Sequence, residues 1–126
     1  MRTKESQTRG QLEARISNEI TGFEKEFMGR GPLDARTYII SDMVIVRLAG
    51  VLTKAERHLT RSERNEQGRD LLKQVRRELI ENQRSALESI IKTTLKRKVK
   101  TLHTDLSTTT GEKIIVFILD KPLEHT

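Results

Sequence analysis

Residues 113–119, with the sequence Lys-Ile-Ile-Val-Phe-Ile-Leu, constrain the fold of this chain more than any other stretch. Successive side chains of a β-strand point to opposite faces, and here both alternating sets are apolar. One set is Ile114, Val116 and Ile118, and the other is Ile115, Phe117 and Leu119. A short apolar run of this kind is typical of a strand in the middle of a sheet. We therefore predict that 113–119 is a central strand.

The rest of the sheet is predicted from two hairpin patterns. Residues 35–40 and 43–49 are rich in β-branched side chains and flank Ser41-Asp42, a candidate two-residue turn. Residues 99–106 precede a turn at 107–111 and the central strand. Because an isolated hairpin is only marginally stable in water, the hairpins should join in one four-stranded antiparallel sheet.

An N-terminal helix is predicted over residues 11–28. Its apolar stripe consists of Leu12, Ile16, Ile20, Phe23 and Phe27. Its solvated face is predicted to carry Glu13, Arg15, Glu19, Glu24 and Lys25. Gly29 suits a left-handed cap and Pro32 cannot continue a helix, so the helix should end at Met28.

Two further helices follow the first hairpin. Residues 52–59 form a short one, in which Thr53 and Glu56 have the spacing of a capping box. No Pro or Gly interrupts residues 69–98, which predicts one long central helix bent near Asn82. Its predicted core stripe is Leu72, Val75, Leu79, Ala86 and Ile90.

The predicted fold is α+β, with two layers: a four-stranded antiparallel sheet from two β-hairpins, packed by the N-terminal helix and the long central helix. At 126 residues the chain should be a single domain. Residues 1–10 are expected to be frayed and residues 120–126 to be a flexible tail.

The residue types argue against several classes of function. The chain has no Cys, and His58, His103 and His125 are too scattered for a metal site, so we predict no metal and no cofactor. No pattern pairs a nucleophile with a base, so we predict that the protein is not an enzyme. The longest apolar run is far below the roughly 20 residues of a membrane span. A cytoplasmic protein is expected.

Positive charge is concentrated near the end of the long helix. The net charge is +6. The basic segment, residues 92–100, contains Lys92, Lys96, Arg97, Lys98 and Lys100. Cations here complement the helix dipole, or they contact phosphates or a partner. A nucleic-acid-binding regulator is therefore one alternative function, although the scarcity of aromatic residues is unfavourable for stacking on bases.

A second group of candidate residues surrounds the first hairpin. Gly29, Arg30, Gly31 and Pro32 end a helix, or they cradle an anion. Thr53 and Glu56 cap the short helix, and Arg57 and His58 beside them could contact an anionic ligand or a partner. A sensor of small anionic ligands, the other alternative function, would have a pocket walled by Gly29–Pro32 and residues 52–59.

Several of these residues, together with two further motifs, resemble a known family. Gly-Arg-Gly-Pro at 29–32, Leu-Thr-Lys-Ala-Glu-Arg-His-Leu at 52–59, the pair Arg76-Arg77 and Val116-Phe117 resemble the MpsC-like family, from about Gly10 to Leu119. This family was formerly described as a domain of unknown function and is named for a Na⁺-translocating, membrane-potential-generating system of bacteria. The resemblance implies a non-catalytic accessory or regulatory protein that binds other proteins, with a link to membrane transport of ions and inorganic carbon. It also implies that Arg76 contacts a partner.

Self-association is predicted from the excess of apolar surface. One face of residues 113–119 stays in water if helices cover only the other. The long helix is expected to contribute further apolar surface through Ile80, Leu87, Ile91 and Leu95. A homodimer through the long helix, the C-terminal strand or both would cover these residues.

Overall fold

The computed structural model describes residues 7–61 and 66–123. The elements are α1 (Arg9–Met28), β1 (Asp34–Ile40), β2 (Met43–Ala49), α2 (Lys54–Arg61), α3 (Glu66–Asn82), α4 (Arg84–Leu95), β3 (Val99–Leu106) and β4 (Lys113–Leu119). The predicted α+β class and both hairpins are confirmed. Of the tails expected at 1–10 and 120–126, residues 1–6 and 124–126 lie outside the described residues, and residues 9 and 10 already belong to α1.

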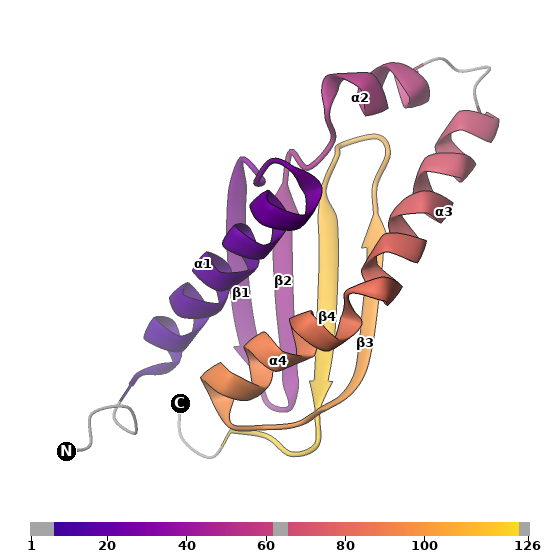
Figure 1. The fold of residues 1–126 in the computed structure, drawn as a ribbon. Helices are drawn as coiled ribbons and strands as arrows, with labels where there is room; N and C mark the ends of the chain where they lie inside the picture. The colour runs from indigo at the N-terminus through magenta and orange to yellow at the C-terminus, as the bar shows by residue number, and fades with distance from the viewer. Residues whose placement is uncertain (1–6, 62–65, 124–126) are drawn as a thin grey trace.

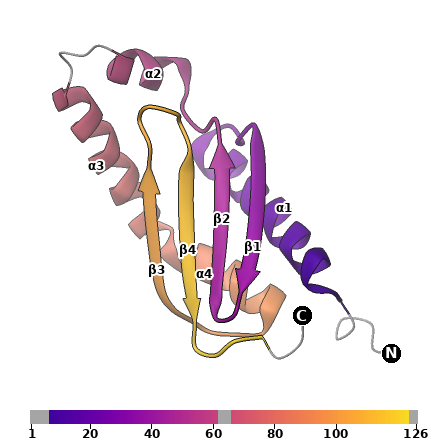
Figure 2. The same cartoon turned by 180° about the vertical axis from the view of Figure 1, so that it is seen from behind.

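The four strands form one antiparallel sheet in the order β1-β2-β4-β3. The predicted central place of the C-terminal strand is confirmed, because β4 lies between β2 and β3. The helices all lie on one side of the sheet (Figure 1), and the view from behind shows the other face uncovered (Figure 2). The core therefore fills one side only, between the sheet and the helices.

Helix α1 ends where its local sequence predicts, but it begins at Arg9, two residues before the predicted start at residue 11. Thr8 caps its N-terminus by accepting a hydrogen bond from the Gln11 amide, and the Gln11 side chain accepts one from the Thr8 amide. At the other end Gly29 has φ +89°, a left-handed conformation that suits glycine, which confirms the predicted stop at Met28. Leu12, Ile16 and Ile20 are buried as predicted.

The prediction that Glu24 lies on the solvated face of α1 is wrong. Its exposure is 2%. Leu12, Ile16, Ile20 and Glu24 follow one another at intervals of four residues, so they share one stripe of the helix. Glu24 thus continues the core stripe toward the sheet, and its partner is described below.

The segment predicted as one long helix bent near Asn82 is divided there into α3 and α4. Gln83 leaves helical geometry at φ −111° and ψ 12°, and its amide bonds back to the Ile80 carbonyl. The break turns α4 across the sheet, whereas α3 rises past β3 toward α2 (Figure 1).

The core stripe of this segment also differs from the prediction. The buried positions are Leu72, Arg76, Ile80, Leu87, Ile91, Thr94 and Leu95, whereas Val75 is 46% exposed. Helical spacing on α3 is compatible with two stripes, one through Val75 and one through Arg76. The stripe through Arg76 is the buried one, and its arginine made it look like a solvated face in the sequence. The expectation that Ile80, Leu87, Ile91 and Leu95 are surplus surface for a dimer is wrong, since these residues cover the sheet.

Helix α1 also protects the outer edge of the sheet. The backbone N–H of Ile39, on the edge strand β1, donates to Glu13 Oε2 over 2.8 Å. Ser17 on the same helix hydrogen-bonds Thr37 over 2.8 Å. Unpaired backbone N–H and C=O groups on an edge strand can pair with a strand of another chain. Because α1 covers part of this edge, the uncovered face of the sheet is the more accessible surface.

Candidate functional site

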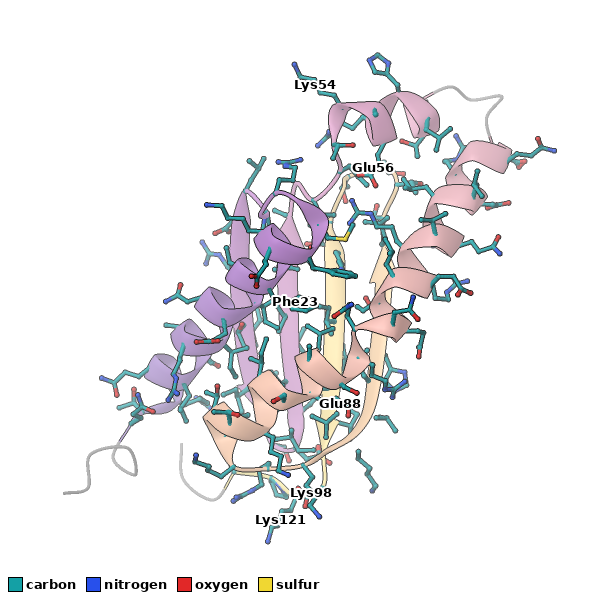
Figure 3. All side chains as sticks on the ribbon, in the orientation of Figure 1. Phe23, Lys54, Glu56, Glu88, Lys98 and Lys121 are labelled. Atoms are coloured by element: carbon teal, nitrogen blue, oxygen red, sulfur yellow. The ribbon has the colours of Figure 1, made fainter. Side chains whose placement is uncertain are left out.

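The structure brings α2, α3 and the end of the first hairpin together around one carboxylate, that of Glu56. The predicted capping box of α2 is confirmed: Glu56 Oε1 accepts from the Thr53 amide over 2.9 Å, and Thr53 Oγ1 accepts from the Glu56 amide over 3.1 Å. Figure 3 shows Glu56 below α2, on the side of the sheet. The cap therefore aims this carboxylate inward.

Arg76 reaches the same carboxylate from α3. Its Nη2 lies 2.6 Å from Glu56 Oε1 and its Nε lies 3.1 Å from Oε2, a bidentate ion pair. Nη2 also donates to the Val51 carbonyl over 3.2 Å. Arg76 is only 7% exposed, so this pair ties three segments together inside the protein.

The pair favours the ionised form of Glu56. Burial raises the pKa of this carboxyl, but hydrogen bonds from Arg76 and from the Thr53 backbone outweigh burial, so its pKa lies below the ordinary 4.5. A charged carboxylate is therefore part of the folded state at neutral pH.

A second buried ion pair lies near the first. Lys113, the first residue of β4, points to the helix side of the sheet, and its Nζ lies 2.8 Å from Glu24 Oε2 on α1. Both side chains are less than a tenth exposed. This pair fixes the end of α1 to the end of the central strand.

The Gly29–Pro32 loop packs against the start of α2. Arg30 Nη1 donates to the Leu52 carbonyl over 2.7 Å, which holds the loop in place. A hollow of about 380 Å³ opens beside this contact, lined by Arg30, Leu33, Gly50, Leu52, Thr53, Lys54 and Arg57. This hollow lies where the sequence analysis expected the pocket of a small-ligand sensor. Three of its lining side chains, Arg30, Lys54 and Arg57, are cationic.

A different hollow lies between α3 and the sheet. Its lining includes Lys73, Arg76 and Arg77 from α3, Asp105 from β3 and Lys113 from β4. Lys73 Nζ lies 3.0 Å from Asp105 Oδ1, and this contact holds the pKa of Asp105 below its ordinary 3.8. Four cationic side chains converge here, and residues 73, 77, 105 and 113 were not predicted as site residues.

The remaining predicted residues lie apart from these groups. His58 is exposed on α2. The basic segment spans the end of α4 and the start of β3, with Lys96 as the left-handed cap at φ +59°. Figure 3 shows Lys98 at the opposite end of the molecule from Lys54 and Glu56. The two groups of predicted residues therefore form separate surfaces.

Comparison with known proteins agrees with this arrangement of motifs. The family model described as "Na+-translocating membrane potential-generating system (MpsC)" matches residues 8–121. The chain belongs to the MpsC family. The MpsC segment covers every helix and strand of the described residues, together with the Thr8 cap of α1, and includes both buried ion pairs. The predicted family resemblance is confirmed.

A curated relative is similar to this chain over almost its whole length. The "Uncharacterized protein YbcI" of Bacillus subtilis (strain 168) is 43% identical over 117 residues, which cover 93% of this chain and 92% of the relative. No solved structure matches the chain. Within residues 7–61 and 66–123 of this MpsC protein, no helix is long and apolar enough to cross a membrane. In the same described part, no three His, Asp or Glu side chains are grouped to hold a metal ion.

The residues of these clusters that were not predicted as site residues are Glu24, Lys73, Arg77, Asp105 and Lys113. A signal for Glu24 existed, because it continues the stripe of Leu12, Ile16 and Ile20 at the same interval. Arg76 follows Leu72 and precedes Ile80 in the same way. Opposite charges at core positions of two helices indicate buried partners, although they do not identify which residues pair.

Proposed function

We propose that this MpsC protein is a non-catalytic, cytoplasmic accessory protein of a membrane-potential-generating ion transport system, and that it acts as a homodimer. The family description supports the link to transport. The buried charges support a non-catalytic role, since Glu24 and Lys113 hold α1 to β4, and Glu56 and Arg76 hold α2 to α3. The observation that carries the proposal is the uncovered apolar face of the sheet.

The apolar part of this open face is built from outward side chains of β1, β2 and β4. The register aligns Tyr38 with Ile45 and Ile45 with Val116, and it aligns Ile40 with Met43 and Met43 with Ile118. Ile40 is 54% exposed and Tyr38 is 38% exposed. The apolar part of the open face therefore consists of Tyr38, Ile40, Met43, Ile45, Ile114, Val116 and Ile118, and the register places the polar residues Arg47, His103 and Asp105 at its border. Contiguous apolar surface of this kind is typical of an interface.

A second copy of the chain fits this face by shape and by size. Four strands about 4.8 Å apart, each of about seven residues at about 3.4 Å, span roughly 450 Å². Side chains that rise from the sheet enlarge that area toward the ~800 Å² per subunit of a standard interface. Two such faces packed about 10 Å apart make a sandwich across a two-fold axis. An interface of this size lies at the small end of stable interfaces.

Sedimentation equilibrium of the wild-type chain and two variants tests the proposal. Val116→Glu places a charge in the middle of the open face, and Ile45→Thr/Val116→Thr keeps β-branched residues while removing apolar contact. Both are expected to be folded monomers of about the 14.5 kDa of one chain. Leu71→Glu is the matched control, because Leu71 is 53% exposed on α3 and away from this face.

The control variant should dimerise like the wild type. A wild-type chain that stays monomeric at tens of micromolar would overturn the dimer. Dissociation by Leu71→Glu, with Val116→Glu still dimeric, would move the interface to α3.

A further inference from the structure

The hollow between α3 and the sheet contains an unsatisfied buried cation. Its polar lining consists of Lys73, Arg76, Arg77, Thr104, Asp105 and Lys113. The volume that the centre of a water-sized sphere can occupy in the hollow is about 20 Å³, enough for one water molecule or one oxygen of a larger group, and the hollow with its open mouth is about 330 Å³. A ligand could thus place one atom inside and the rest at the mouth.

Arg76 lines this hollow and carries a donor without an acceptor. Its Nε and Nη2 are used by Glu56 and Val51, whereas Nη1 has no hydrogen-bond partner among the described residues and exposes less than 1 Å². The guanidinium is a planar fork, so Nη1 lies on the edge turned away from the bidentate Glu56 contact. A buried N–H of a charged group without an acceptor is strongly unfavourable, which indicates that an acceptor binds here.

The local charges favour an anion as that acceptor. The hollow has four cations, Lys73, Arg76, Arg77 and Lys113, against one lining carboxylate, Asp105. Glu56 neutralises Arg76 and Glu24 neutralises Lys113, which leaves Lys73 and Arg77 to share Asp105. One positive charge is therefore in excess. Water would satisfy Nη1 but not this charge.

We propose that the hollow binds a small inorganic oxyanion of the size of phosphate or sulfate. One anion oxygen accepts from Arg76 Nη1 in the inner space, and the others face Lys73 and Arg77 at the mouth. Donors come from a helix on one wall and from Thr104 and Lys113 of the strands on the other. Such convergence from several directions suits a tetrahedral anion better than a planar carboxylate.

Isothermal titration calorimetry with inorganic phosphate tests the proposal, at ionic strength held constant with sodium chloride. Saturable one-to-one binding is expected for the full chain, with sulfate competing and acetate at least ten-fold weaker. Glycerol 3-phosphate forms a separate arm: binding as tight as phosphate would assign the site to a phosphate ester instead of the free anion.

Variants locate the anion. Arg77→Gln removes a mouth cation without touching the Glu56 pair and should weaken phosphate binding at least ten-fold. Lys92→Gln is the charge-matched control, because it removes one cation from α4 outside the hollow, and it should bind as the wild type does. Arg76→Lys keeps the charge but loses the forked donor, so it should abolish binding; if this variant does not fold, Arg77→Gln remains decisive. No phosphate heat in the wild type, or equal weakening by Lys92→Gln, would overturn the proposal.

Discussion

Lys113 Nζ donates to Glu24 Oε2 over 2.8 Å, and the two residues are 89 positions apart in the chain. Their side chains are 9% and 3% exposed, so the contact lies in the core between the end of α1 and the start of β4. Taking two charges out of water is unfavourable, and the pair is tolerated only while each has the other. The consequences of that dependence can be measured.

Breaking this pair on one side should be much worse than replacing it whole. Lys113→Met leaves the Glu24 carboxylate buried without a partner and should lower the free energy of unfolding by about 3–5 kcal/mol. Glu24→Met/Lys113→Met removes both charges and should recover most of that loss. Urea unfolding followed by circular dichroism measures both. Arg36→Ala, which removes an exposed pair with Asp34, is the control and should cause no measurable change. A double variant as unstable as Lys113→Met would show that the pair has another role.

The Glu56 carboxylate should make stability sensitive to acid. Its pKa in the folded protein is below the ordinary 4.5, so the folded state favours the ionised form more than the unfolded chain does. This stabilisation is fully present above pH 4.5 and is lost as the pH falls through the lower, folded-state pKa. Glu56→Gln should therefore be less stable than the wild type at neutral pH, and the gap should narrow below pH 4.5. Thermal unfolding from pH 3 to pH 7 provides the comparison. A gap that does not change with pH would exclude the linkage.

The first hairpin should be stabilised by a glycine. Ser41 has φ +57°, whereas Asp42 is not among the residues with positive φ. A turn with positive φ only at its first central residue favours glycine there. Ser41→Gly should raise the free energy of unfolding by about 0.5–1 kcal/mol, since relief of the left-handed strain outweighs the added freedom of the unfolded chain. Asp42→Gly is the matched control and should lower stability. Chemical denaturation of both variants decides between them.

Two isoleucine substitutions should separate the core from the open face. Ile91 is fully buried on α4, so Ile91→Glu places an unpaired charge in the core and should yield an unfolded chain. Ile118 belongs to the open face and is only partly covered, so Ile118→Glu should yield a folded monomer. Circular dichroism and sedimentation of each variant distinguish the outcomes. A folded dimer of Ile118→Glu would exclude the face-to-face arrangement.

Local sequence patterns determined most of the secondary structure. The turn at Ser41-Asp42, the Thr53–Glu56 cap and the stop at Gly29 all depend on residues within a few positions of one another, so the chain's own short-range chemistry is enough. The central place of β4 also followed from sequence, because a strand that is apolar on both faces is unfavourable at an edge. These elements were predicted to within a few residues.

The tertiary structure decided which charges enter the core. On α3, the stripe through Val75 and the stripe through Arg76 are both compatible with helical spacing, and only the presence of Glu56, 20 residues away, makes burial of Arg76 favourable. Glu24 depends in the same way on Lys113. Sequence also left open which face of β4 would be covered. Both faces of β4 are apolar, and only the packing of all the helices on one side of the sheet left the other side open (Figures 1 and 2). Val116 and Ile118 remain partly exposed there. The free energy of burying each of these side chains depends on a partner far away in the chain. No single segment of the sequence contains both partners.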